Sequence, residues 1–523
     1  MKTTAPVSPA TPAATLARRI AIAAVLIAVG NIASRVLGLA RESVIASQFG
    51  RDVDTFTAAS SIPTIIYDLL VNGAISAALV PVFSEYAEGD EREFWRVGST
   101  VINLTLIVVS AVAALLIWQA PLAIGVLAGG FPPSIREEST QMVRLLLPAV
   151  IFMGLSGLIT ALLYARQRFL LPAFNTSAYN GGIILGALLL TPVFGPFSLV
   201  AGVLIGALLQ VGLQLPGLRG MAYRLVLDLK HPGVRKILKL YAPVAMGIVF
   251  SIIGIVLDRN LASHVGDNAL TIMRYATTLI QFPLGLVVTA VSFAVLPTLS
   301  RQASAGDDDA FRTTLAMGIK VVLLLILPAA LGLAALSSPI TAAIFQRGKF
   351  GAGDTGEVAR ALLFYLPGLP AAAIDQMLLF AFYAHKRTLA PNLVQGGAVA
   401  IYAATAFSLL ALGMGVGALI LGNSAQWISH LLILLVLSRS LVSLRGVRLG
   451  EALLKSLLAG LAMAALVWWL VSVVRPFGGP LIQLVVAGGA GAAVYFGLCA
   501  LLRVEALQFF LAAVRRRFGR RDE

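Results

Sequence analysis

The sequence predicts an all-α polytopic membrane protein, and three observations support this fold class. Of its 523 residues, 59% are hydrophobic and 12% are charged, whereas a soluble globular domain carries about 25% charged residues. The mean hydropathy is +0.91. Apolar stretches recur along the whole chain, and about 20 mostly apolar residues are enough for a helix to cross the hydrocarbon core. This composition excludes a soluble enzyme, a disordered chain and a collagen.

We count fourteen such stretches, and each is predicted to form one transmembrane helix. They lie near residues 20–48, 56–84, 97–122, 140–165, 172–192, 197–218, 238–263, 270–299, 312–336, 356–384, 390–413, 416–438, 452–474 and 480–502. Residues 1–17 are rich in Ala, Pro and Thr and are expected to form a disordered cytoplasmic tail. Residues 504–523 carry a basic cluster and are expected to form a second cytoplasmic tail.

The distribution of basic residues predicts the orientation. The chain has 39 Lys and Arg against 24 Asp and Glu, and most of the basic residues fall in the two tails and in the loops on their side of the membrane. Cytoplasmic loops carry an excess of Lys and Arg, so both termini are expected to be cytoplasmic. The net charge of +15 therefore indicates topology and contact with membrane lipids. Because no soluble basic domain is present, no nucleic acid partner is predicted.

An internal repeat divides the predicted helices into two sets. Residues 46–84 align without a gap with residues 262–300, and just before these segments Glu42 aligns with Asp258. The first predicted helix thus corresponds to the seventh, an offset of six helices, and because six is an even number, both sets run in the same direction through the membrane. The sequence thus predicts two pseudo-symmetric parallel six-helix lobes plus two C-terminal helices, a plan with a substrate site between the lobes. The predicted divisions are 18–230 for the first lobe, 231–445 for the second and 446–503 for the last two helices.

Ionisable residues inside the predicted helices are the first candidates for function. A charge at the bilayer centre costs at least about 2.5–3.5 kcal/mol, so such residues face a water-filled cavity or a charged partner. Arg35 and Arg41 lie on the first predicted helix, and Arg274 lies on the eighth. A guanidinium group donates two parallel hydrogen bonds to a phosphate, so these arginines suit a phosphorylated substrate. The alternative is local neutralisation, in which Arg41 simply satisfies its neighbour Glu42.

A second group of charged residues is a candidate for an ion site or a gate. The pair Asp258-Arg259 corresponds to Arg41-Glu42 in the repeat with the order reversed, and Asp375 lies in the middle of the tenth predicted helix. Local neutralisation is again the alternative. Four His and one Cys give no plausible structural zinc site, so no metal is predicted. The sequence also lacks the common nucleotide-binding, metalloprotease and serine hydrolase motifs, so no enzyme is predicted.

Several motifs resemble those of the MurJ (MviN) lipid II flippase family. Residues 34–42 are similar to the S-R-x-L-G-x-x-R-[DE] signature of its first helix. Further similar segments follow in the family's order: 54–56 to D-A-F, 73–86 to the motif that ends in V-P-x-F-x-E-Y, 168–174 to R-F-x-x-P-A-F, 345–350 to F-x-x-G-x-F, and 382–391 to F-Y-A-x-x-x-T-x-x-P. Each segment alone is weakly specific, but their order and spacing along most of the chain are specific together.

The resemblance implies a fold, a substrate and a site. Such proteins have fourteen helices in the multidrug/oligosaccharidyl-lipid/polysaccharide exporter fold. They move the undecaprenyl-pyrophosphate-linked peptidoglycan precursor, lipid II, from the inner to the outer leaflet of the bacterial inner membrane by alternating access. By this resemblance Arg35 and Arg41 contact the pyrophosphate, Glu42 and Asp54 belong to the same site, and the last two helices hold the lipid tail. Asp258 falls where some members have an acid of a sodium site. No cofactor is implied, and coupling to the membrane potential or to a monovalent ion stays open.

Two arginines of the family pattern are absent. Tyr67 occupies one of these positions in the second predicted helix, and Thr278 occupies the other in the eighth. Arg274 lies one turn before Thr278, so we expect it to reach the same space or an acid such as Asp258. This departure keeps open an exporter of another lipid-linked glycan and a non-transporting scaffold for cell-wall synthesis proteins. A membrane-embedded glycosyltransferase or polymerase is an alternative from a different class of protein. The short outer loops disfavour the enzyme, which would need a catalytic acid in a sizeable outer loop.

Overall fold

The computed structural model describes residues 12–220, 222–387, 389–509 and 511–512, and within these ranges it contains helices and no strand. The first half of the chain forms ten α-helices: α1 Pro12–Phe49, α2 Asp54–Tyr67, α3 Val80–Ala87, α4 Glu91–Trp118, α5 Ala120–Leu127, α6 Pro133–Ala165, α7 Leu170–Ala173, α8 Asn175–Leu189, α9 Thr191–Phe194 and α10 Phe197–Gln214. Two π-helical segments, η1 Asp68–Asn72 and η2 Ile75–Leu79, continue α2 into α3, and a 3-10 turn, η3 Leu215–Leu218, follows α10.

The second half forms ten further α-helices: α11 Pro232–Val265, α12 Ala269–Ala305, α13 Asp308–Ala335, α14 Ser337–Phe345, α15 Ala352–Tyr365, α16 Leu369–Ala384, α17 Leu389–Ala411, α18 Val416–Leu437, α19 Leu449–Val474 and α20 Pro480–Leu501. A short 3-10 turn, η4 Ser438–Ser440, follows α18.

The predicted all-α polytopic fold is confirmed. Ten helices among the described residues are long and apolar enough to cross a membrane, or eleven if α15 and α16, which meet at a bend of 45°, form one span. Each of the predicted stretches coincides with a helix or with a broken run of helices, so the predicted number of fourteen is compatible with the structure. The helix α1 begins at Pro12, within the predicted disordered tail, because the Ala and Leu residues that follow favour a helix. Residues 1–11, and the basic tail from 513 on, lie outside the described residues.

In the first lobe, α6 packs against α2, α4 and α10, while α8 packs against α10 and α1. The contact between α8 and α10 depends on glycines. A Cβ atom added to Gly182 would lie 2.2 Å from the Cα of Gly206, so the two backbones approach as closely as small residues permit.

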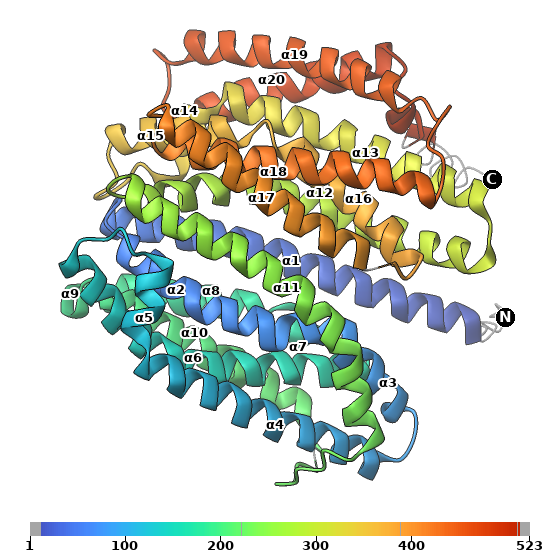
Figure 1. Cartoon of the computed structure of the whole chain (residues 1–523). Helices are drawn as coiled ribbons and strands as arrows, with labels where there is room; N and C mark the ends of the chain where they lie inside the picture. The colour runs from blue at the N-terminus through green and yellow to red at the C-terminus, as the bar shows by residue number, and fades with distance from the viewer. Residues whose placement is uncertain (1–11, 221, 388, 510, 513–523) are drawn as a thin grey trace, which may run out of the picture.

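In the second lobe, α12 packs against α13, α15 and α16, and α18 packs against α16 and α17. The last two helices form a separate layer: α19 packs on α13 and on α20, on the side of the second lobe that faces away from the first (Figure 1).

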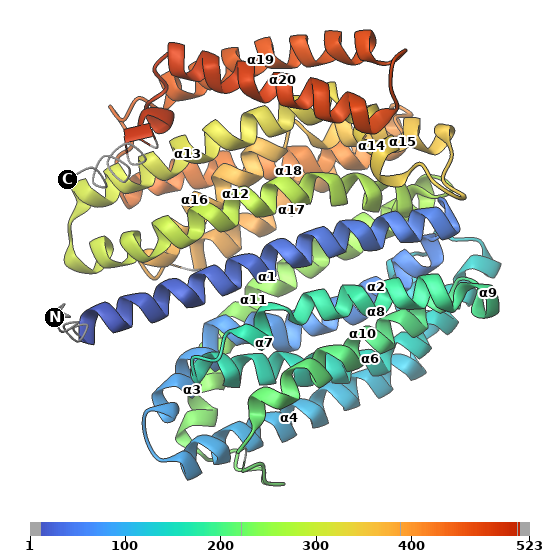
Figure 2. The same cartoon turned by 180° about the vertical axis from the view of Figure 1, so that it is seen from behind.

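Two long helices lie between the lobes (Figures 1 and 2). Helix α1 contacts α7 and α8 of the first lobe and α12 and α14 of the second, and α11 contacts η1 and η2 of the first and α17 and α18 of the second. The start of α1 and the end of α20 lie at one end of the molecule, whereas α5, α9, α14 and α15 lie at the other, which we call the loop end. The boundaries of the lobes stay a prediction, because α1 and α11 belong to both by contact.

Candidate substrate cavity between the lobes

A cavity of about 370 Å³ lies between α1, α8 and α12. Both arginines predicted from the first helix, Arg35 and Arg41, line it. The other lining residues are mostly polar or small: Asn31, Ser34, Gly38, Leu39, Thr176, Asn180, Thr278, Gln281 and Phe282. None of these residues is acidic, so the two guanidinium groups make the cavity suited to an anion.

Arg35 reaches across the cavity to the second lobe. Its Nη1 atom donates a hydrogen bond of 3.0 Å to the backbone oxygen of Gln281 on α12. One turn further along α12, a Cβ atom added to Gly285 would lie 2.2 Å from the guanidinium carbon of Arg35. The position of the arginine therefore depends on the missing side chain at Gly285, a residue that the sequence did not single out.

We expect Gly285→Ala to lower transport about ten- to a hundredfold, because the added methyl group displaces the Arg35 guanidinium by an ångström or more. Alanine favours a helix over glycine, so the abundance of the variant should stay near that of the wild type. Reconstituted transport and immunoblotting measure the two quantities. The matched control is Gly397→Ala on α17, where an added Cβ meets no atom within 4 Å. Equal transport by Gly285→Ala and the wild type would show that Arg35 needs no such space.

Arg41 is held by two side chains of the first lobe. Its Nη2 atom lies 2.6 Å from Oε1 of Glu42, and its Nη1 atom donates a hydrogen bond of 2.9 Å to Oδ1 of Asn180 on α8. Asn180 in turn donates a hydrogen bond of 3.1 Å to the backbone oxygen of Ser34 on α1. Adjacent Arg and Glu residues thus pair, as the neutralisation alternative predicts, while Arg41 still lines the cavity. Asn180 was missed by the sequence analysis.

Glu42 is also the partner of Arg274. Its side chain is 1% exposed and accepts hydrogen bonds of 2.8 and 2.9 Å from Nε and Nη2 of Arg274 on α12. Arg274 further contacts Thr57 at 3.3 Å and lies over the ring of Phe56, both on α2. Arg274 was expected to reach either the space beside Thr278 or an acid such as Asp258. The structure shows an ion pair with an acid, and that acid is Glu42 on α1. A single carboxylate joins an arginine from each lobe.

Further contacts between the lobes close the loop end. Asp54 at the start of α2 accepts hydrogen bonds at Oδ1 from the backbone nitrogen of Thr271 at 2.7 Å and from its hydroxyl at 2.5 Å. The Tyr275 hydroxyl donates to the backbone oxygen of Gly50 at 2.9 Å. Asp54 thus caps the first turn of α12. It is not among the residues that line the cavity, so the structure places it at this closed end, and its role in the substrate site stays a prediction.

Asp258 and Arg259 are not paired with each other. Asp258 accepts hydrogen bonds from the Tyr402 hydroxyl of α17 at 2.7 Å and from the Asn423 amide of α18 at 3.0 Å. The Nε atom of Arg259 is buried and makes no hydrogen bond within the described residues. The structure therefore differs from the expected symmetry with Arg41 and Glu42, because the short Asp258 side chain turns into the second lobe.

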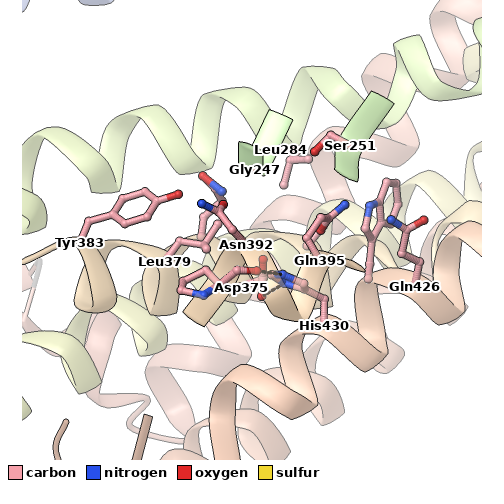
Figure 3. A pocket seen from close by; sticks show the side chains of 14 residues that line it. Gly247, Ser251, Leu284, Asp375, Leu379, Tyr383, Asn392, Gln395, Gln426 and His430 are labelled. Atoms are coloured by element: carbon pink, nitrogen blue, oxygen red, sulfur yellow. Dashed lines mark hydrogen bonds and ion pairs between the residues drawn. The ribbon is translucent and has the colours of Figure 1, made fainter. Parts of the chain in front are cut away.

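Asp375 forms a pair with a histidine that the sequence analysis did not consider. Its Oδ1 atom lies 2.8 Å from Nδ1 of His430, which comes from α18 (Figure 3). Both side chains line a second cavity, of about 380 Å³, inside the second lobe. No group of three or more metal-ligating side chains occurs within the described part of the chain.

The helices form the two-lobed polytopic fold expected from the sequence, with a cavity between the lobes. A solved multidrug resistance MATE family transporter of the MOP superfamily, in an inward-facing conformation, shares this fold. Its TM-score is 0.64 at 13% sequence identity, and the match covers 80% of this chain and 95% of that chain.

The family model described as lipid II flippase MurJ matches residues 45–485, and the chain belongs to this family. The lipid II flippase MurJ of Burkholderia cenocepacia is 30% identical over 69% of this chain and 72% of the relative. The probable lipid II flippase MurJ of Haemophilus influenzae is 30% identical over 84% of this chain and 91% of the relative. A solved lipid II flippase MurJ in an inward closed conformation matches with a TM-score of 0.77 at 25% identity, covering 91% of this chain and 98% of that chain.

Proposed function

We propose that this protein is a lipid II flippase of the bacterial inner membrane. The observation that carries the proposal is the pair of arginines, Arg35 and Arg41, in a cavity between the lobes of a MurJ-family fold. Lipid II joins its sugar to the lipid through a pyrophosphate, and guanidinium groups bind phosphate oxygens bidentately. With Arg274 beside them, three arginines exceed the single carboxylate of Glu42 by two positive charges. The excess suits a pyrophosphate group.

The closed loop end suggests how the lobes act. In the described state, hydrogen bonds and ion pairs between the lobes seal this end. If the substrate headgroup enters from the side of the termini, these contacts must break to release it on the other side. The lipid tail stays in the bilayer, next to the separate layer of α19 and α20. No covalent bond changes in this cycle, so no catalytic group and no cofactor are needed, and the membrane potential or a monovalent ion supplies the energy.

The test is transport of lipid II by the purified protein in vesicles, with complementation of cells depleted of their own lipid II flippase. We expect labelled lipid II to become accessible on the far side of the vesicles and growth to be restored. Transport of another undecaprenyl-pyrophosphate-linked glycan in place of lipid II would favour the related exporter. Restored growth without any transport would favour the scaffold for cell-wall synthesis proteins.

A cysteine pair across the loop end should block transport reversibly. A Cβ atom built on Gly50 lies 3.5 Å from the Cβ of Lys349, within the separation that disulfides need. Gly50 has a φ of +63°, which side chains rarely adopt, so we expect Gly50→Cys/Lys349→Cys to transport lipid II more slowly than the wild type in a reducing buffer and to stop in an oxidising one. The single variants are the controls, because neither can form the bond. Full transport by the oxidised, cross-linked protein would contradict alternating access at this end.

Labelling from outside the cell tests the proposed orientation, in which both termini are cytoplasmic. Positions 235 and 347 are both exposed, and they lie near the start of α11 and in the loop between α14 and α15. In a variant without the buried Cys499, we expect a cysteine at Arg347 to react with an impermeant maleimide on intact cells. A cysteine at Arg235 should react only after the cells are broken. The reverse pattern would show the opposite orientation.

A further inference from the structure

The second cavity is a polar chamber inside the second lobe. It has a volume of about 380 Å³ and is lined from α11, α12, α16, α17 and α18. Side-chain amides dominate its polar lining, together with two ionisable groups, Asp375 and His430 (Figure 3). None of its lining residues lines the cavity that holds Arg35 and Arg41, so the proposed pyrophosphate site leaves the chamber without a role.

The hydrogen bonds of His430 determine how many protons the pair holds. Its Nε2 atom lies 3.4 Å from the backbone oxygen of Pro391, and its Nδ1 atom lies 2.8 Å from Oδ1 of Asp375. A backbone carbonyl only accepts hydrogen bonds, so Nε2 carries a hydrogen. One more proton can then lie between Nδ1 and the carboxylate, either on the imidazole or on the acid. The pair is therefore a site for one proton.

Losing that proton changes the electrostatics of the chamber. With the proton bound, Asp375 and His430 are neutral together, either as an ion pair or as two neutral groups. Without it, a negative carboxylate faces the lone pair of Nδ1, with side chains only 13% and 8% exposed. An unpaired charge is costly inside a membrane protein, and two acceptors that face each other repel. The proton therefore stabilises the contact that joins α16 to α18.

No other charged group in the chamber competes with this pair. Of the lining residues, Tyr383 on α16 is the only further one that titrates, and its ring is partly exposed. The lining residues from the other elements do not titrate: Gly247 and Ser251 on α11, Leu284 on α12, Pro391, Asn392 and Gln395 on α17, and Gln426 and Trp427 on α18.

Close packing links the pair to the interface between the lobes. Pro391 accepts from His430, and the next residue, Asn392, packs against α11 so closely that a Cβ atom on Gly247 would lie 2.6 Å from its amide. On the same helix, Ile248 approaches Gly73 of the first lobe, where an added Cβ would lie 2.3 Å from the isoleucine side chain. A shift of α17 therefore moves α11, which contacts both lobes.

We propose that the Asp375–His430 pair is a proton-binding site whose occupancy changes with the movement of the lobes. A proton gradient then contributes to the energy of transport. The claim that the pair binds a proton, the proton-binding half of the proposal, depends only on the geometry of the chamber. The claim that a proton gradient contributes to transport, the transport half, rests on the proposed flippase function.

Nitrogen NMR of labelled histidine tests the proton-binding half without any substrate. The chain has four histidines, so signals of the protein in nanodiscs can be assigned by single substitutions. We expect the His430 ring to carry a hydrogen at Nε2, and its Nδ1 signal to show a hydrogen bond with Asp375. Asp375→Asn removes the carboxylate that faces Nδ1, so the Nδ1 signal of His430 should change in this variant. A His430 ring with an unprotonated Nδ1 that ignores Asp375→Asn would overturn the site.

Transport under an imposed pH gradient tests the second half, with the membrane potential clamped at zero. A gradient of one pH unit changes the ratio of proton-bound occupancies up to about tenfold, so the wild-type rate should change severalfold and in the opposite sense when the gradient is reversed. Asp375→Asn and His430→Gln should lose this response. His385→Gln should keep it, because His385 lies at the end of α16 against Phe311 and outside the chamber.

The outcomes separate the two proposals. A wild-type rate that ignores the pH gradient, or one that follows a sodium gradient instead, overturns proton coupling while lipid II transport still stands. A wild type that does not move lipid II in any buffer overturns the flippase function, and the histidine signals then decide the proton site by themselves.

Discussion

Arg41→Ala and Arg35→Ala are each expected to abolish lipid II transport. Both side chains line the cavity between the lobes, and each guanidinium group can donate two parallel hydrogen bonds to a phosphate. A hydrogen bond to a charged group contributes about 1.5–3 kcal/mol, so the loss of two such bonds lowers substrate binding roughly a hundredfold or more. Abundance should stay nearly normal, because Glu42 keeps Arg274 as a partner when Arg41 is removed. Reconstituted transport and immunoblotting measure both quantities.

The lysine variants and a distant arginine are the controls for this prediction. Arg35→Lys and Arg41→Lys keep the charge but lose the planar fork, so transport should recover only in part. Arg144→Ala removes an exposed arginine of α6 that lines neither cavity, and it should transport normally. Full transport by both alanine variants of the cavity arginines would remove them from the substrate site.

The fold could be predicted from the sequence because it depends on the length and number of the apolar stretches, which can be read directly along the chain. Stretches of about 20 apolar residues must become helices in a bilayer, since every backbone polar group needs a partner there. The repeat between 46–84 and 262–300 predicts two parallel lobes, because the relative direction of the lobes depends only on the number of helices between corresponding positions. The tenth predicted stretch is less regular than expected, because α15 and α16 meet at a bend of 45°.

The pairing of charges could be predicted only in part, because it depends on how helices far apart in the chain face each other. The long side chain of Arg41 reaches its neighbour Glu42, whereas the short Asp258 turns away from Arg259 towards Tyr402.

No local pattern shows that Glu42 meets Arg274, or that His430 meets Asp375. These contacts are set by the rotation and offset of packed helices. The role of Gly285 is equally invisible in the sequence, because a glycine in a membrane helix has many uses.

Arg274→Ala is expected to lower transport at least about tenfold while the protein still folds. The variant loses two charge-assisted hydrogen bonds between α12 and Glu42, each worth about 1.5–3 kcal/mol in a buried setting. Glu42 keeps Arg41 at 2.6 Å, so no buried carboxylate is left unpaired. Glu42→Ala should behave differently. It leaves Arg41 and Arg274 without their shared anion, and removing one partner of a buried ion pair costs about 3–5 kcal/mol. Thermal unfolding in detergent distinguishes the two variants.

Moving the arginine shows whether Arg274 acts in place of the arginine that the family pattern has at Thr278. Thr278 lines the cavity, and its hydroxyl donates to the backbone oxygen of Arg274 one turn away. One turn is about 6 Å along the helix axis, which an arginine side chain can span. Thr278→Arg added to Arg274→Ala should therefore restore part of the transport. The double variant Glu42→Ala/Arg274→Ala should regain part of the stability lost in Glu42→Ala, since it removes one of the two unpaired arginines. It should not regain transport, because Arg274 itself is absent. A fully active Arg274→Ala, or a relocated arginine that restores nothing, would show that Arg274 has only a structural role. The substrate site would then depend on the two arginines of α1 alone.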